Sequence, residues 1–222
     1  MMHSNFYDTQ PYYNQDRDNQ RNIRVVGIGS IQAEPDIAIV NLGVITEDKN
    51  LETAQRENIM ISNRVINQLE EMGISRRDIK TSIYNIEPQY DYIEGKQVFR
   101  NYKVTNIFTV TIRDIRRVGE IIDASVSIGA NNVGNISFTI SDPRYYYNRA
   151  LQLAVIDAVE KAITIGDTLK VSVNTIPNSI KEQAPIQEFE SRAMMKTYTA
   201  STPVMPGEIE ITARVEGSFQ YW

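Results

Sequence analysis

The stretch RVVGIGSI at residues 24–31, followed by QAEPDIAIV at residues 32–40, decides which fold class the chain can adopt. Its two glycines, Gly27 and Gly29, suit either a phosphate-binding loop or a strand that leads into another strand. A dinucleotide-binding loop needs a third glycine and must open a helix. Here Gly29 is followed by Ser30 and further strand-forming residues. The glycines are therefore interpreted as strand positions, and the stretch predicts no nucleotide site.

A hairpin is predicted around the end of this stretch. Residues 23–31 form its first strand and residues 37–45 its second, and the turn between them contains Pro35. In the second strand, apolar side chains recur at every second position, namely Ala38, Val40, Leu42 and Val44. This period of two is typical of a strand with one buried face. The short connection favours pairing of the two strands with each other.

Capping residues and periodicity predict the elements in the middle of the chain. Asn50 is suited to cap the start of a helix, and Gly73 is suited to end that helix. The turn-like DYIEGK joins two long strands that are typical of half-buried antiparallel sheets. The predicted elements are a helix at 51–72, strands at 78–90 and 97–113, a short helix at 115–127 and a strand at 136–141.

The clearest helix start in the sequence is Asp142 followed by Pro143, because aspartate caps free N–H groups and proline suits the first helical position. This helix is expected to end near Leu169. Small residues recur on it every four positions: Ala150, Ala154, Ala158, Ala162 and Gly166. Such a ridge permits close approach of a partner surface. Packing against the sheet is expected rather than pairing in a membrane, since the helix carries several charged side chains.

The predicted fold class is α+β, with a mixed, largely antiparallel sheet of long strands packed against two long helices and one short helix. Residues 23–222 are expected to form one compact domain that closes on a strand at 208–219. Residues 1–22 are polar and lack any helix or strand period, which predicts a flexible tail, either solvated or in contact with a partner. An irregular segment at 181–207 is expected to serve function or assembly.

Composition excludes several classes of function. The chain has 23 Lys and Arg against 28 Asp and Glu, a net charge of −5, so general nucleic-acid binding is not expected. Cysteine is absent and His3 is the single histidine, which removes thiolate metal sites and histidine-based triads. The carboxylate pairs lie on predicted turns or a helix end: Glu34/Asp36, Glu70/Glu71 and Asp91/Glu94. We therefore expect no catalytic residue, no cofactor, no metal and no membrane span.

Two groups of residues are candidates for binding a partner. Arg113, Arg116 and Arg117 form a basic group that could join the Arg76–Arg77 pair to bind a polyanion, or could stay solvated and paired with acids. Tyr145 and Tyr146 lie in RYYYNRALQLA, where successive helical residues point about 100° apart and cannot form one stacking platform. Some of these tyrosines are expected to seal the core. Candidate oligomer contacts are Met194, Met195 and Tyr198.

The order and the residues of several motifs resemble the SIMPL domain, a family of unknown function that includes bacterial periplasmic oxidative-stress-defence proteins and an immunogenic outer-membrane-associated protein. The resemblance covers about residues 23–220 and rests on VVGIGSIQAEPDIAIVNLGV, DIKTSIYNIEPQYDY, the stretch YKVTNIFTVTIRDIRRVGEIIDASVSIGANNVGNISFTISD, the alanine helix and TPVMPGEIEITARV. It implies a mixed sheet and helix fold and homo-oligomers, ring-like in some members. It implies no established catalytic residues.

The leading hypothesis is a non-enzymatic, self-assembling protein with a role in stress tolerance or cell-envelope upkeep. The alternative is a binding module for a polyanion, a glycan or another protein, and an enzyme built from Asp, Glu, Lys, Ser and Tyr is kept as the third. Residues 1–22 lack the apolar region of a secretory signal, although family members are periplasmic. The expected location is therefore cytoplasmic or associated with the spore or envelope, unless an export signal was removed.

Overall fold

The computed structural model describes residues 21–183, 191–192 and 204–222. Its contacts divide the chain into two compact units. Among the described residues, the terminal unit consists of 21–29, 151–183 and 213–222, and the central unit consists of 30–150, 191–192 and 204–212. The single domain expected over 23–222 stays a prediction, and each unit is described by itself.

The described strands form two four-stranded sheets, and the fold is α+β as predicted. One sheet has the order β1-β8-β6, with β7 also on β8, and comprises β1 (Asn22–Ala33), β6 (Ser179–Gln183), β7 (Ser191–Arg192) and β8 (Glu208–Gln220). The other has the order β3-β4-β2-β5 and comprises β2 (Ile37–Asp48), β3 (Ile79–Ile93), β4 (Lys96–Ile112) and β5 (Asn132–Thr139). The predicted single sheet is thus replaced by two.

The hairpin predicted between residues 23–31 and 37–45 is wrong, because β1 and β2 belong to different sheets. Both edges of β2 are occupied, by β4 and by β5. Asp36, in the connection between β1 and β2, donates its N–H to the carbonyl of Thr139, and its carboxylate accepts the N–H of Ser141 at 2.7 Å. These bonds turn the chain towards β5. Alternation of apolar residues identifies a strand, but it carries no information about the strand's partner.

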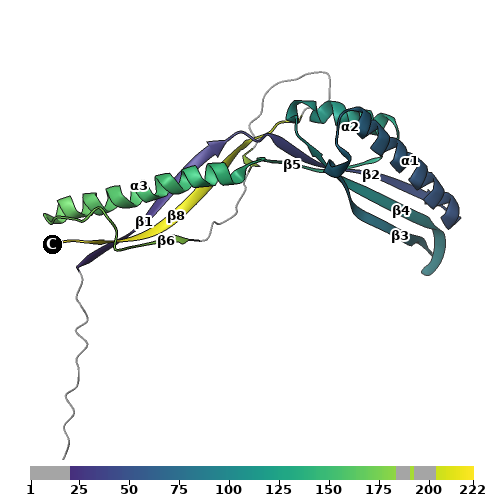
Figure 1. Cartoon of the computed structure of the whole chain (residues 1–222). Helices are drawn as coiled ribbons and strands as arrows, with labels where there is room; N and C mark the ends of the chain where they lie inside the picture. The colour runs from purple at the N-terminus through teal and green to yellow at the C-terminus, as the bar shows by residue number, and fades with distance from the viewer. Residues whose placement is uncertain (1–20, 184–190, 193–203) are drawn as a thin grey trace, which may run out of the picture. The chain divides into compact units, whose positions relative to one another are not determined.

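The central unit has one large core on one face of its sheet. Helices α1 (Leu51–Glu71) and α2 (Val118–Ser127) lie on that face (Figure 1). The fully buried side chains of this core include Leu42, Leu69, Val110, Ile112 and Ile121. The short 3₁₀ turns η1 (Arg76–Asp78) and η2 (Ile115–Arg117) come directly before β3 and α2. The core therefore fixes the ends of β4 and α1, where the candidate arginines lie.

The predicted boundaries of α1 are confirmed by its caps. The side chain of Asn50 accepts the N–H of Thr53 at 3.1 Å, and Gly73 has a φ of +89°, which ends the helix. The turn in DYIEGK is tighter than predicted, since Glu94 and Gly95 alone separate β3 from β4 with φ values of +52° and +78°. Strand β5 starts before the predicted position 136.

Helix α3 (Pro143–Leu169) begins as predicted, with the N–H of Tyr145 donated to the carboxylate of Asp142 at 3.1 Å. The small-residue ridge is buried along its whole length, as expected. In the terminal unit α3 lies along β1 (Figure 1). The ridge packs against this strand, because a Cβ on Gly27 would collide with the carbonyl oxygen of Ala154 and lie 2.8 Å from the Cβ of Ala158. Gly27 is thus a point of close approach between helix and strand. Within the described residues, no helix is long and apolar enough to cross a membrane.

Candidate functional site

Arg113 stands just after β4 and forms a two-pronged ion pair with Asp78 of η1. Its Nη2 lies 3.0 Å from Oδ1 of Asp78, and its Nε lies 3.4 Å from Oδ2. The aspartate side chain is only 12% exposed, whereas that of Arg113 is 58% exposed. The pair therefore joins the end of β4 to the start of β3, and it leaves part of the guanidinium open to solvent.

Arg116 is held by Asp114, which also caps the turn η2. The carboxylate of Asp114 accepts the backbone N–H of Arg116 at 3.2 Å and its Nε at 2.8 Å. The side-chain bond from Arg116 holds the pKa of Asp114 below its ordinary value and raises the pKa of Arg116. The Arg116 side chain is 86% exposed, so this pair is a solvated surface feature.

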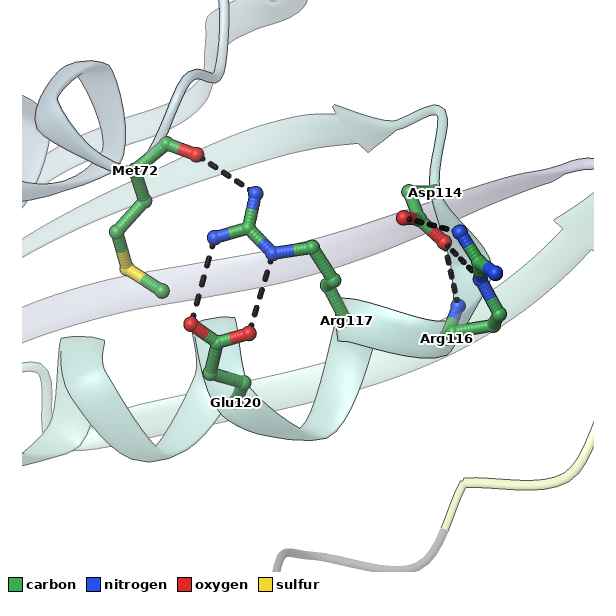
Figure 2. Close-up of polar contacts among 5 residues, drawn as sticks. All are labelled: Met72, Asp114, Arg116, Arg117 and Glu120. Atoms are coloured by element: carbon green, nitrogen blue, oxygen red, sulfur yellow. Dashed lines mark hydrogen bonds and ion pairs between the residues drawn. The ribbon is translucent and has the colours of Figure 1, made fainter.

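Arg117 joins two elements of the central unit. Its Nη1 donates to the carbonyl oxygen of Met72 at 2.9 Å, and its Nε and Nη2 bind the carboxylate of Glu120 at 3.1 and 3.3 Å. Figure 2 shows this group beside the separate pair of Asp114 and Arg116. Met72 follows the last residue of α1, where helix carbonyls lack intrahelical partners, so the arginine satisfies one of them. The hydrogen bond from Arg117 also lowers the pKa of Glu120.

A hollow of about 310 Å³ brings some of these arginines together. Arg113, Arg117 and Arg77 line it, as do the carboxylates Asp78 and Asp114. Arg116 is not among the lining residues, and Arg76 pairs with Glu70 at 3.5 Å. The predicted basic group is therefore divided by the fold, and acids balance most of its charge. The signal for Arg77 was present in the sequence as the Arg76–Arg77 pair.

The tyrosines at the start of α3 have different environments. Tyr145 is exposed, and its hydroxyl accepts a bond from Arg149 at 3.4 Å. Its ring meets that of Tyr146 edge-on, with 5.2 Å between centroids. Tyr146 and Tyr147 pack against a small core formed by Ala33, Ile140, Ile209 and Ile211. The expectation that some of these tyrosines seal the core is confirmed, and they form no common stacking face.

The remaining predicted positions are three candidate oligomer contacts and the carboxylate pairs. Met194, Met195 and Tyr198 lie outside the described residues. One member of each carboxylate pair has a structural partner: Asp36 binds Ser141, Glu70 binds Arg76 and Asp91 binds Arg100. In the part of the chain that the structure describes, no group of three or more acidic or histidine side chains could hold a metal ion.

Sequence reasoning missed a group of exposed apolar side chains on the hairpin of β3 and β4. We call residues 83–102 the hairpin arm. Its exposed apolar side chains are Ile83, Tyr84, Tyr90, Tyr92, Ile93, Val98 and Phe99, and Tyr92 is 76% exposed. Ring contacts connect Tyr90 to Phe99 and Phe99 to Tyr102, with centroids 6.0 and 5.1 Å apart. The signal in the sequence was apolar residues at neighbouring positions, which a hairpin with one buried face would not have.

The apolar side chains of the hairpin arm project from both faces of the hairpin. Tyr92 and Ile93 are successive residues of β3, opposite Gln97 and Lys96, and successive strand residues face opposite sides. On the face towards α1, the hydroxyl of Tyr84 accepts a bond from Gln55 at 3.1 Å. Exposed ion pairs accompany the apolar residues: Arg100 with Asp91 and Glu47, and Lys103 with Glu87.

Comparison with known proteins gives one family and several relatives. The family described as SIMPL, protein of unknown function (DUF541), matches residues 23–219. The chain is 30% identical over 209 residues to the 26 kDa periplasmic immunogenic protein of Brucella melitensis, covering 89% of this chain and 84% of that protein. It is 27% identical over 136 residues to the uncharacterized protein YggE of Escherichia coli K12, covering 61% of this chain and 55% of the relative.

Proposed function

The chain belongs to the SIMPL (DUF541) family, whose function is unknown, and from this premise we propose that it is a non-enzymatic, self-assembling protein of the bacterial cell envelope. The envelope assignment is supported by the name of the Brucella relative, which places that protein in the periplasm. The cellular process that we propose for this chain is envelope upkeep or stress tolerance. The assembly assignment is supported by the hairpin arm.

The hairpin arm is the observation that carries the assembly proposal. Scattered apolar residues are normal on a protein surface, but a contiguous exposed group of large ones marks an interaction site. Aromatic residues in particular are enriched at interfaces, because they bury a large area with few rotatable bonds. The arm has them on both faces, so a partner that covers one face leaves the other for a further contact.

The occupant that we propose for the arm is a second copy of this chain. The arm and its margin carry both signs of charge, with Lys96, Arg100 and Lys103 against Glu87, Asp91 and Glu94. A surface of mixed charge can meet a copy of itself without net repulsion, as a self-complementary oligomer contact requires. Met194, Met195 and Tyr198 remain proposed as additional contacts in the same assembly.

Placing charge on the arm is expected to break the assembly. Ile83→Lys combined with Tyr92→Lys puts an ammonium group on each face of the hairpin at exposed positions, where burial against another copy would cost its hydration. Native mass is measured by size-exclusion chromatography with light scattering over a concentration series. The wild type should give a discrete oligomer and the double variant a monomer with an unchanged circular dichroism spectrum.

The matched control is Ile59→Lys with Met60→Lys, which replaces two exposed apolar residues of α1. This control should keep the wild-type mass. A wild-type protein that is monomeric at every concentration would contradict the assembly proposal. Equal loss of mass in both double variants would show that added charge, rather than the arm, is responsible.

A second candidate function is polyanion binding at the arginine-lined hollow, because Arg77 forms no ion pair with any described residue and Arg113 is partly open to solvent. Arg77→Ala with Arg113→Ala is expected to weaken capture on immobilised heparin by about tenfold, since charge-assisted bonds to the polyanion are lost. Arg117 is left intact because it holds the carbonyl of Met72. The control is Arg56→Ala with Arg64→Ala, which removes the same charge from the exposed side of α1. Equal retention of both variants would exclude the hollow as the binding site.

A further inference from the structure

One backbone edge of β1 carries no strand from the described part of the chain. Among the described residues its sheet neighbour is β8, which leaves its other side without a strand. Arg21, just before β1, accepts the N–H of Tyr221 at 2.9 Å, and Ser30 contacts Thr212 through their hydroxyl groups, so β1 and β8 run antiparallel. In such a ladder every second residue bonds to the neighbour, and the residues between them direct N–H and C=O outwards. Counting from Arg21, Val26 and Ile28 belong to the outward set.

Two side chains of α3 bind these outward groups. The carboxylate Oδ2 of Asp157 accepts the N–H of Ile28 at 2.7 Å, and Nζ of Lys161 donates to the carbonyl oxygen of Val26 at 2.9 Å. The two side chains also bind each other, with 2.6 Å between Lys161 Nζ and Asp157 Oδ2. The bond from Lys161, followed by that from Ile28, holds the pKa of Asp157 below its ordinary value. Acceptor and donor are thus both charged and joined into one group.

This group has the hydrogen-bonding pattern of a strand residue. The carbonyl of Val26 and the N–H of Ile28 flank Gly27, and one residue of an added parallel strand would donate to the first and accept from the second. Lys161 supplies the donor and Asp157 the acceptor at these positions. We propose that the Asp157–Lys161 pair is an edge cap, which occupies the free edge of β1 and prevents the addition of a strand from a second copy of the chain.

The close packing of α3 makes the cap geometrically feasible. Because Gly27 has no side chain, the helix backbone approaches β1 at Ala154 and Ala158, and Asp157 lies beside this contact. A helix further away would leave the carboxylate short of the strand edge. Charged groups that protect an edge strand are a general defence against open-ended association. The small-residue ridge and the cap therefore work together, since the first positions the second.

The outer edge of β3, which carries no other described strand, is interrupted by different means. Pro88 lies within β3 and has no N–H to offer an added strand, and the register shifts between Thr81 and Ile83. The proline is visible in the sequence and the bulge in the pairing of β3 with β4, whereas the cap on β1 depends on two side chains of α3. The outer edges of the long strands β1 and β3 thus both resist the addition of another strand. Association through side-chain faces, such as those of the hairpin arm, is compatible with both.

The test combines Asp157→Ala with Lys161→Ala and follows hydrogen exchange at the Ile28 amide together with native mass. At low protein concentration this amide should exchange about tenfold faster than in the wild type, because its acceptor is gone. As the concentration rises, the variant should form species larger than those of the wild type, and the Ile28 amide should become protected again. Adding Val26→Lys, whose side chain faces solvent, should restore the wild-type mass.

The control Arg144→Ala with Glu160→Ala removes one base and one acid from exposed positions of α3 and should behave as the wild type. If the double variant does not fold, Lys161→Met alone frees the Val26 carbonyl and keeps the aliphatic stem. Loss of protection at every concentration with unchanged mass would overturn the proposal, because the pair would then be merely structural. The comparison is between variant and wild type, so it remains decisive even if the wild type is monomeric and the assembly proposal fails.

Discussion

Gly27→Ala is expected to lower the free energy of unfolding by about 3 kcal/mol, although alanine ordinarily stabilises a strand relative to glycine. The added Cβ would collide with the carbonyl oxygen of Ala154 and crowd the Cβ and N of Ala158. These are backbone or ridge atoms of α3, which have no rotamer that could move aside. The helix would have to withdraw from β1, and the contacts of the buried ridge would be lost with it. Urea unfolding followed by circular dichroism gives the value.

The control for this variant is Val26→Ala, at the neighbouring position whose side chain faces solvent. The free energy of unfolding should fall by well under half as much, because the Val26 side chain is already 42% exposed. Equal stability of Gly27→Ala and the wild type would mean that α3 does not pack against β1 at this point. Gly27→Ala should also speed exchange at the Ile28 amide, since the edge cap depends on the same close approach.

Asn58→Leu is expected to lower the free energy of unfolding by about 3 kcal/mol through the core of the central unit. Asn58 has 0% exposure and connects α1 to two strands. Its amide donates to the carbonyls of Val44 at 2.9 Å and Val104 at 3.2 Å, and its oxygen accepts the hydroxyl of Ser62 at 3.3 Å. Leucine has a similar volume but makes none of these bonds, so the polar groups would remain buried without them.

Asn63→Leu provides the matched comparison, because it is the same replacement on the exposed side of the same helix. Its effect should stay within about 0.5 kcal/mol. Chemical unfolding monitored by circular dichroism measures both variants. A small effect of Asn58→Leu would show that packing of leucine compensates for the lost bonds, and that the polar connection is not required for stability.

Predictions from the sequence succeeded where the physical cause is local. Asn50 and Asp142 cap helices through bonds to residues three positions away, so their signals lie within a short window. The small-residue ridge was also evident, because helical spacing alone places its members on one stripe. In the candidate site, neighbouring arginines were visible in sequence, but the ion pair of Arg113 with Asp78 and the hydrogen bond from Arg117 to the carbonyl of Met72 were not.

The amino-acid sequence by itself determined the helices, most of the strands and the buried stripe of α3, since caps and periodicity act over a few residues. Only the tertiary structure decided that β1 pairs with β8 rather than β2, because every strand offers the same backbone groups and the sequence pattern does not select among them. It also decided that Asp157 and Lys161, which resemble an ordinary surface pair at helical spacing, bind the edge of a strand 129 and 135 residues earlier in the chain. Contacts over such separations depend on packing of the whole unit, and local patterns do not contain them.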